Sequence, residues 1–330
     1  MIAESTDPVI PSDADALVRV RGLTRRFHGK TAVDSLDFDI RRGEILGFLG
    51  PNGAGKTTTM RMLTGYLPPT AGSVVIAGWD ILANPIEARL ATGYMPENVP
   101  LYTDMRIKEY LQFRAELKGL KGKPMRQRVG EVMQVCGLTD VRRRLIGNMS
   151  KGYRQRIGLA DALVHEPELL ILDEPTNGFD PNQIRQVRGL IRELAGRHTI
   201  LLSTHILAEV EQTCDRVIIL DEGRIKAIDT PQALAAGLRA AGRIRLEIQC
   251  PDGENACERL RGIDGVRTAT VESVMADNWH VIELCVESSA DVRVAVVDAM
   301  RSSAWPLREI HMLPNRLEDV FLELTHRAAR

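Results

Sequence analysis

One stretch of the chain has residue types and spacing suited to holding phosphate groups. Gly50-Pro-Asn-Gly-Ala-Gly-Lys-Thr57 fits the pattern G-x-x-x-x-G-K-[ST], between a predicted strand at Glu44 to Leu49 and a helical run from Lys56. The glycines let backbone N–H groups converge on phosphate oxygens, and the helix start adds a favourable dipole. Lys56 would reach the β and γ phosphates and Thr57 would ligate Mg²⁺. Alone, this loop predicts only nucleoside triphosphate binding, and a glycine-rich tight turn is the alternative.

A pair of adjacent carboxylates, Asp173 and Glu174, follows the apolar run Leu169 to Leu172. The carboxyl end of such a strand is where catalytic groups lie on open parallel sheets. The first acid can hold Mg²⁺ through water and the second can polarise an attacking water, so the pair suits hydrolysis. The alternative is an ordinary strand-ending turn. The four apolar residues that lead into the pair favour a catalytic site.

A third motif, Met149-Ser-Lys-Gly-Tyr-Arg-Gln-Arg156, lies just ahead of these acids and opens a helical run. Ser150 is a natural N-cap, so the helix start presents free N–H groups to an anion. We therefore expect a second phosphate-facing helix start, distinct from the one at Lys56.

Strands alternate with helical segments along the first two thirds of the chain, which predicts an α/β fold with a mostly parallel sheet flanked by helices. We expect one helical region from about Met105 to Val135. The expected strands are Leu17 to Val20, Ser35 to Ile40, Glu44 to Leu49, Ser73 to Ala77, Thr92 to Met95, Leu169 to Leu172, Thr199 to Ser203 and Val217 to Leu220.

The last third of the chain predicts a separate small α+β domain over residues 240–330, with a boundary near Thr230 to Gly242. Arg243 to Gln249 and His280 to Val286 alternate apolar and polar residues, as half-buried strands do. The stretches around Ala256 to Gly262 and Val292 to Ser302 have a helical pattern. We find no catalytic constellation in this region. Its 11 arginines against 15 acidic residues give it no basic face by composition.

Length and composition limit the remaining possibilities. At 330 residues the chain exceeds the usual size of one compact core, so we expect two domains, with residues 16–232 forming the larger one. Residues 1–15 lack the order of a signal peptide and predict a disordered arm. The net charge of -1 disfavours nucleic-acid binding, and no apolar run approaches the roughly 20 residues that span a bilayer. Five scattered cysteines predict buried thiols in a reducing compartment.

Taken together, these motifs resemble the nucleotide-binding subunit of an ABC transporter over roughly Leu17 to Thr230. They occur in the family's order: the loop at Gly50, Met149-Ser-Lys-Gly-Tyr, Asp173-Glu174, Asn177-Gly-Phe-Asp180 and His205. The resemblance implies a P-loop ABC ATPase fold with a helical subdomain, and two subunits that enclose two Mg-ATP molecules.

The resemblance also implies a role for individual residues. Phe27 would stack on adenine, Ser150 and Gly152 would bind the γ-phosphate held by a second subunit, and Asp180 would connect the two sites. Glu174 would be the general base, and His205 would hold the γ-phosphate and the attacking water in line. A core aromatic at Phe27 and a structural histidine at 205 are the ordinary alternatives. The implied cofactor-binding residues are Phe27, Gly50, Pro51, Asn52, Gly53, Ala54, Gly55, Lys56, Thr57, Thr58, Ser150, Gly152 and Asp180, and the metal site comprises Thr57, Glu97 and Asp173.

Two positions depart from the family pattern. Glu97 stands where glutamine is common, and it can still ligate Mg²⁺ but cannot donate an amide hydrogen bond. Glu97 could also be an exposed loop acid. Lys151 in Ser-Lys-Gly-Tyr adds a cation beside the partner's nucleotide or lies on the solvated side of its helix, and the second reading is slightly favoured. These departures bear on turnover rate more than on the reaction.

The motif details resemble bacterial exporter ATPases of the antibiotic-resistance and gliding-motility type, which use a separate membrane permease. The resembling segments are Ser150 to Arg156, Gly93 to Asn98 and Pro314 to Leu324, and Leu317 to Leu324 has the apolar spacing of a docking or domain-closing helix. We expect a peripheral protein at the cytoplasmic face of the membrane that forms a homodimer and contacts permease subunits through the region from Glu97 to about Gly119.

Other functions stay open at this point. A soluble ABC-type ATPase acting on nucleic acid or ribosomes is the main alternative, although only 92 residues separate Thr57 from Ser150, which leaves little room for a long insertion. A P-loop kinase is a third reading, and an importer ATPase fits the same hydrolysis chemistry. The transported substrate cannot be read from this chain.

Overall fold

The computed structural model describes residues 16–237, 242–286, 292–313 and 321. The chain divides into two compact units, one ending at Ile228 and the other beginning at Asp229. The predicted arm at residues 1–15 and most of the predicted helix at Leu317 to Leu324 lie outside the described residues. No described helix is long and apolar enough to cross a membrane.

A six-stranded sheet forms the centre of the first unit, in which β3 pairs in parallel with β8 and β9, and β7 pairs in parallel with β6 and β8. Its order is β10-β9-β3-β8-β7-β6. The inner strands are wholly buried, as apolar runs covered on both faces should be. The bounds are β3 Ile45–Leu49, β6 Thr92–Met95, β7 Leu169–Asp173, β8 Thr199–Thr204, β9 Arg216–Asp221 and β10 Arg224–Asp229.

A second sheet of the first unit is antiparallel, with the order β2-β1-β4-β5, and it contains the predicted strands at Leu17 to Val20, Ser35 to Ile40 and Ser73 to Ala77. The cause of the antiparallel direction is local. His28 and Gly29 both adopt positive φ, 37° and 88°, which makes a two-residue hairpin and obliges its two strands to run antiparallel. The bounds are β1 Ala16–Phe27, β2 Lys30–Arg41, β4 Ala71–Ile76 and β5 Trp79–Asp80.

Helix α1 (Lys56–Leu63) packs between these two sheets. Its Met60, Met62 and Leu63 are buried in one core with side chains from β1, β2 and β4 and from the parallel strands β3 and β7. This core fixes the start of α1 against the end of β3, where the glycine loop lies.

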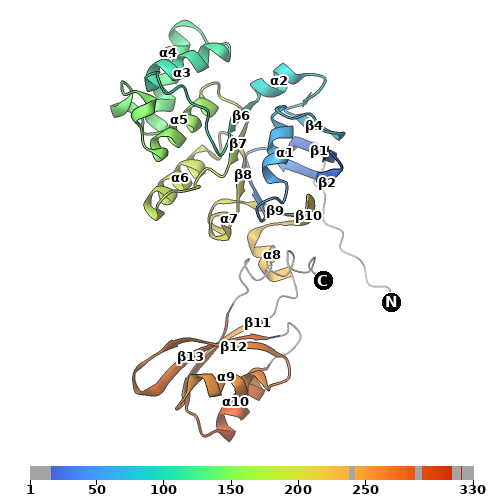
Figure 1. Ribbon diagram of the computed structural model, residues 1–330, viewed down its shortest axis with the longest axis vertical. Coiled ribbons are helices and arrows are strands. Elements are labelled where there is room, and N and C mark those ends of the chain that lie inside the picture. The colour runs from blue at the N-terminus through green and yellow to red at the C-terminus, as the bar shows by residue number, and fades with distance from the viewer. Residues whose placement is uncertain (1–15, 238–241, 287–291, 314–320, 322–330) are drawn as a thin grey trace. The chain divides into compact units, whose positions relative to one another are not determined.

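Helices gather beside the parallel sheet as a helical subdomain, drawn in green in Figure 1. The helical region expected from about Met105 to Val135 contains two helices, α3 and α4, which are separated at Gly119, whose φ is 87°. The bounds of the helices are α2 Pro85–Leu90, α3 Ile107–Leu117, α4 Gly122–Val135, α5 Lys151–Leu163, α6 Pro181–Leu194 and α7 Leu207–Thr213, with 3-10 turns at Thr139–Val141 and Ile146–Asn148.

The second unit contains an antiparallel sheet of order β12-β13-β11-β14 in a βαββαβ chain order. One face of the sheet and helices α9 and α10 enclose a core of its own that includes Ile244, Leu246 and Ile282. The predicted segments at 243–249, 256–262, 280–286 and 292–302 are confirmed as β11, α9, β13 and α10. The bounds are α8 Pro231–Gly237, β11 Gly242–Gln249, α9 Gly253–Arg261, β12 Val266–Val274, a 3-10 turn Ala276–Asn278, β13 Trp279–Val286, α10 Arg293–Ser302 and β14 Leu307–Leu313.

Candidate nucleotide-hydrolysis site

The glycine loop leaves the carboxyl end of β3 and enters α1, as its sequence predicts. Two of its glycines are required by close approach. A Cβ at Gly50 would meet the Leu220 carbonyl oxygen at 2.4 Å, and Gly55 combines a φ of 103° with the Ala32 carbonyl 2.8 Å from where a Cβ would lie. The loop is thereby held against neighbouring backbone, which leaves its N–H groups to define a phosphate-sized cradle.

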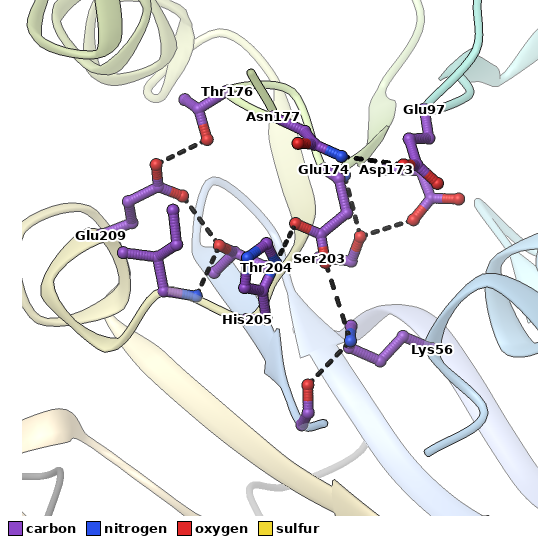
Figure 2. Close-up of polar contacts among 12 residues, drawn as sticks. Lys56, Glu97, Asp173, Glu174, Thr176, Asn177, Ser203, Thr204, His205 and Glu209 are labelled. Carbon is purple, nitrogen blue, oxygen red and sulfur yellow. Dashed lines mark hydrogen bonds and ion pairs between the residues drawn. The ribbon is translucent and has the colours of Figure 1, made fainter. Parts of the chain in front are cut away.

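Lys56 is buried at the base of this loop. Its Nζ donates to the carbonyl oxygens of Gly50, at 2.8 Å, and Pro51, at 3.2 Å, and lies 3.6 Å from Oε1 of Glu174. Figure 2 shows the ammonium group lying between the loop and the acid pair. The cation is thus held in place by contacts within the chain.

Asp173 ends β7 and joins the loop to the neighbouring strand. Its Oδ1 accepts from the hydroxyl groups of Ser203, at 2.6 Å, and Thr57, at 3.3 Å. Its Oδ2 is buried and has no hydrogen-bond partner among the described residues. Burial raises the pKa of this carboxyl; the two hydroxyl hydrogen bonds lower it, and the neighbouring charges of Glu174 and Glu97 raise it again.

An unpartnered carboxylate oxygen beside a threonine hydroxyl is the donor set that Mg²⁺ prefers. Asp173 and Thr57 therefore fit this cation, and Mg²⁺ would neutralise charge on the phosphates when bound. No group of three or more His, Cys, Asp or Glu side chains suited to a metal occurs among the residues that the structure describes.

Glu174 is buried and held from two sides, although it lies at a turn. Oε2 lies 2.8 Å from Nδ1 of His205, and Oε1 faces Lys56 (Figure 2). Its backbone N–H is fixed by Oγ of Ser203 at 3.0 Å. Its φ of 48° is unusual for a non-glycine residue, and such strain concentrates at active sites. The structure thus brings together three of the predicted residues, Lys56, Glu174 and His205.

A buried network behind this site has no counterpart among the predicted residues. Glu209 on α7 accepts from Thr176 at 2.5 Å and from Thr204 at 2.8 Å, and so ties the turn after Glu174 to the end of β8 (Figure 2). Glu209 is 3 % exposed, which a charged residue tolerates only when its oxygens are bonded. The network fixes the segment that carries His205. The only sequence signal was an acid four residues after that histidine.

Glu97 does not lie free in a loop. Its Oε1 accepts from the Asn177 amide at 2.8 Å, and its backbone carbonyl accepts from the Gln155 amide at 3.1 Å. The loop after β6 is thereby connected to α5 and to the turn that follows Glu174.

The residues predicted to face a second subunit lie at helix starts. Ser150 caps α5 and accepts from the Tyr153 N–H at 3.4 Å, and Gly152 lies in the same first turn. Asp180 caps α6 and accepts from the N–H groups of Asn182 and Gln183. Within the described ranges, no hydrogen bond or ion pair joins Ser150 or Gly152 to the glycine loop or the acid pair.

Phe27 ends β1 with its side chain partly exposed, so it is not the core aromatic of the alternative reading. The Arg25 guanidinium lies 4.5 Å from the centre of its ring. An exposed aromatic ring can stack on a base. The remaining predicted residues of the glycine loop differ in their exposure. Asn52 and Gly53 are exposed and Ala54 is buried, and the part-buried ones are Pro51, Gly55, Thr57 and Thr58.

Comparisons with known proteins show similarity to ABC transporter ATP-binding proteins. A family model described as "ABC transporter" matches residues 33–177. The chain is 41% identical to the bacitracin transport ATP-binding protein BcrA of Bacillus licheniformis, over 63% of this chain and 68% of that protein. It is 35% identical to the Nod factor export ATP-binding protein I of Ralstonia nicotianae, over 95% of each.

A solved structure described as the ATP binding subunit of an ABC transporter superposes with a TM-score of 0.63 at 32% identity. The match covers 68% of this chain and 95% of that one. Sequence and fold thus point to the same family over most of the chain.

Proposed function

The chain belongs to the family of ABC transporter ATP-binding proteins, and on that premise we propose that two copies enclose two Mg-ATP molecules and power a separate membrane exporter. Family membership makes the chain an ATPase that binds ATP. The observation that carries the finer proposal is the position of Glu174, buried between Lys56 and His205 beside Asp173.

In the proposed reaction the chain's own residues bind, orient and move one proton. Backbone N–H groups of the loop and Lys56 bind the phosphates. Water attacks the γ-phosphorus, the bond to the β–γ bridging oxygen breaks and ADP leaves, while Glu174 accepts the proton of the water. His205 orients the Glu174 carboxylate, and Asp173 with Thr57 would hold Mg²⁺.

We assign Ser150 and Gly152 to the nucleotide on a partner's cradle, with Asp180 connecting the two sites and Phe27 stacking on adenine. Their position at helix starts supports this assignment, because such N–H groups bind anions and no bond joins them to their own cradle among the described residues. A single chain would then be catalytically incomplete.

Mixing two inactive variants tests the shared site. Lys56→Ala disables a cradle, whereas Gly152→Asp sets a carboxylate against the partner's phosphate. A Cβ at Gly152 meets Gln183 at 3.5 Å and Phe179 at 3.9 Å, which are ordinary van der Waals contacts, so the fold should accept it. In a mixed dimer, one site combines the intact cradle with the intact helix start, so ATPase activity should return. Lys56→Ala mixed with Glu174→Gln is the matched control and should stay inactive, because both defects fall on cradles. No recovery in the first mixture, with dimers verified, would contradict the proposal.

A basic groove beside the loop after β6 supports docking of a membrane subunit. It encloses about 800 Å³ and is lined by Arg61, Arg89, Arg114 and Lys118. The last two share Asp161, at 2.9 and 3.1 Å, which leaves the groove net positive. We therefore propose that the permease contacts this groove with an acidic segment, which would hold the protein at the cytoplasmic face of the membrane.

Charge reversal tests the docking. Arg89→Glu should reduce copurification with the permease, whereas Arg126→Glu, on the exposed side of α4, should not.

The relatives named for bacitracin transport and Nod factor export favour an exporter. ATPase stimulation by nucleic acid or ribosomes, and not by permease in vesicles, would support the alternative of a soluble ATPase.

A further inference from the structure

A second cavity of the first unit lies between α5 and α6, the two helices capped by Ser150 and Asp180. It encloses about 410 Å³, within the usual range for small-molecule sites. Its lining includes apolar side chains of β6, β7, α5 and α6: Met95, Leu172, Leu159, Val187, Leu190 and Ile191. The cavity is separate from the basic groove and shares no lining residue with it.

Five polar side chains line this cavity: Gln134, Gln155, Arg156, Gln186 and Glu193. Gln155 lines it and is 6% exposed, and its Oε1 has no hydrogen-bond partner among the described residues. A buried carbonyl without a partner is costly, and a ligand donor can satisfy it. Arg156 and Gln186 also line the cavity and join α5 to α6 through a hydrogen bond of 2.6 Å. The cavity therefore offers apolar side chains, one buried acceptor without a partner among the described residues, and a polar link between its two helices.

We propose that this cavity binds a small apolar molecule carrying one hydrogen-bond donor, and that the bound molecule regulates the ATPase. Residues that line the cavity connect it to the hydrolysis site. Pro175, next to Glu174, lines the cavity, and the Nε2 of Gln155 donates to the carbonyl of Glu97, whose side chain bonds Asn177. A molecule wedged between α5 and α6 changes the relative position of the two helix starts that face the partner subunit.

Gly189 provides a way to fill the cavity without disturbing a contact. It lines the cavity on α6, and a Cβ at this position would meet no atom within 4 Å. Gly130 in α4 is the matched control, because it is also a helical glycine with open space and lies outside the cavity lining. Phe at 189 should occupy the cavity, whereas Phe at 130 should not.

Indole is a suitable probe because it is apolar and has one N–H donor, and 1-methylindole carries a methyl group in place of the hydrogen of that donor. Titration of the full chain by calorimetry, without ATP, should give saturable binding with a Kd on the order of 1 mM or tighter. Binding of 1-methylindole should be about fivefold weaker. The Gly189→Phe protein should lose binding and the Gly130→Phe protein should keep it.

The regulatory part is read from ATPase activity in the same proteins. Indole should change turnover in the wild-type and Gly130→Phe proteins but not in the Gly189→Phe protein. The proposal is overturned if indole does not saturate, if it binds the Gly189→Phe protein unchanged, or if 1-methylindole binds as tightly, which would assign the free Gln155 oxygen to a bound water. Because binding is measured without ATP, failure here leaves the proposed function untouched.

Discussion

The carboxylate of Glu174 lies 2.8 Å from Nδ1 of His205. The other oxygen of the same carboxylate faces Lys56, which is also held by two loop carbonyls. Lys56 and Glu174 are thus paired with each other within the chain. In the proposed reaction, a phosphate oxygen would replace Glu174 as the anion at Lys56, which would release one carboxylate oxygen for the attacking water.

Replacing Glu174 by glutamine should separate ATP binding from hydrolysis. Glutamine preserves the size of the side chain but cannot accept the proton, so turnover should fall by at least about 100-fold while ATP still binds. Nucleotide binding measured by fluorescence and phosphate release provide the two readouts. Glu258→Gln, on the exposed side of α9 in the second unit, is the control. Robust turnover in Glu174→Gln would remove this residue from the role of base.

The part of the site that is local in sequence could be predicted, because a glycine loop needs only its own backbone and the adjoining strand and helix. The Asp173-Glu174 pair was equally readable from the apolar run before it. The contacts of Ser203 with Asp173 and of Glu209 with Thr176 could not be predicted, since they join segments about 30 residues apart on neighbouring elements. Single serines, threonines and acids give no signal of such pairing.

The fold shows the same division between local and long-range information. Short buried strands such as Thr92 to Met95 follow from their apolar runs, and that strand has the predicted bounds. Which sheet a strand joins depends on its connection, and the His28-Gly29 turn was not recognised as the hairpin that makes the second sheet antiparallel. β12 and β14 were missed because their residues are largely exposed and lack a strong alternating pattern.

Replacing Asp173 by asparagine should abolish Mg²⁺-dependent hydrolysis and stabilise the nucleotide-free protein. Burial raises the pKa of this carboxyl, so the folded protein binds its proton more tightly than the unfolded chain does. The carboxylate therefore costs no stability below the usual aspartate pKa, and the cost appears as the pH rises through the folded-state pKa. At pH 7 the variant should gain on the order of 1 kcal/mol in urea unfolding, and the gain should vanish near pH 3. A loss of stability at pH 7 would show that the charged form is favoured.

Glu97→Gln should weaken the binding of Mg²⁺ without disturbing the fold. The amide oxygen of glutamine can still accept from Asn177, which Glu97 does at 2.8 Å. The lost negative charge should raise the Mg²⁺ concentration for half-maximal ATPase activity by about tenfold. Glu97→Ala, which also loses the bond to Asn177, should reduce turnover further. An unchanged Mg²⁺ titration in the glutamine variant would place Glu97 outside the metal site.

Acid should destabilise the protein through His165, a part-buried residue far from the proposed chemistry. Its Nε2 donates to the Thr92 carbonyl at 3.1 Å, and burial, with the nearby Lys118 cation, lowers its pKa to about 4. The folded protein binds this proton less readily than the unfolded chain does, so stability is complete above pH 6.5 and is lost as the pH falls toward 4. The free energy of unfolding should fall by about 2 kcal/mol over this pH range, after allowance for the partial exposure of His165. Urea unfolding at pH 7.5 and 4.5 measures it. In His165→Gln, which retains a donor for Thr92, the pH dependence should shrink by that amount, and a variant with the wild-type dependence would assign the effect to other groups.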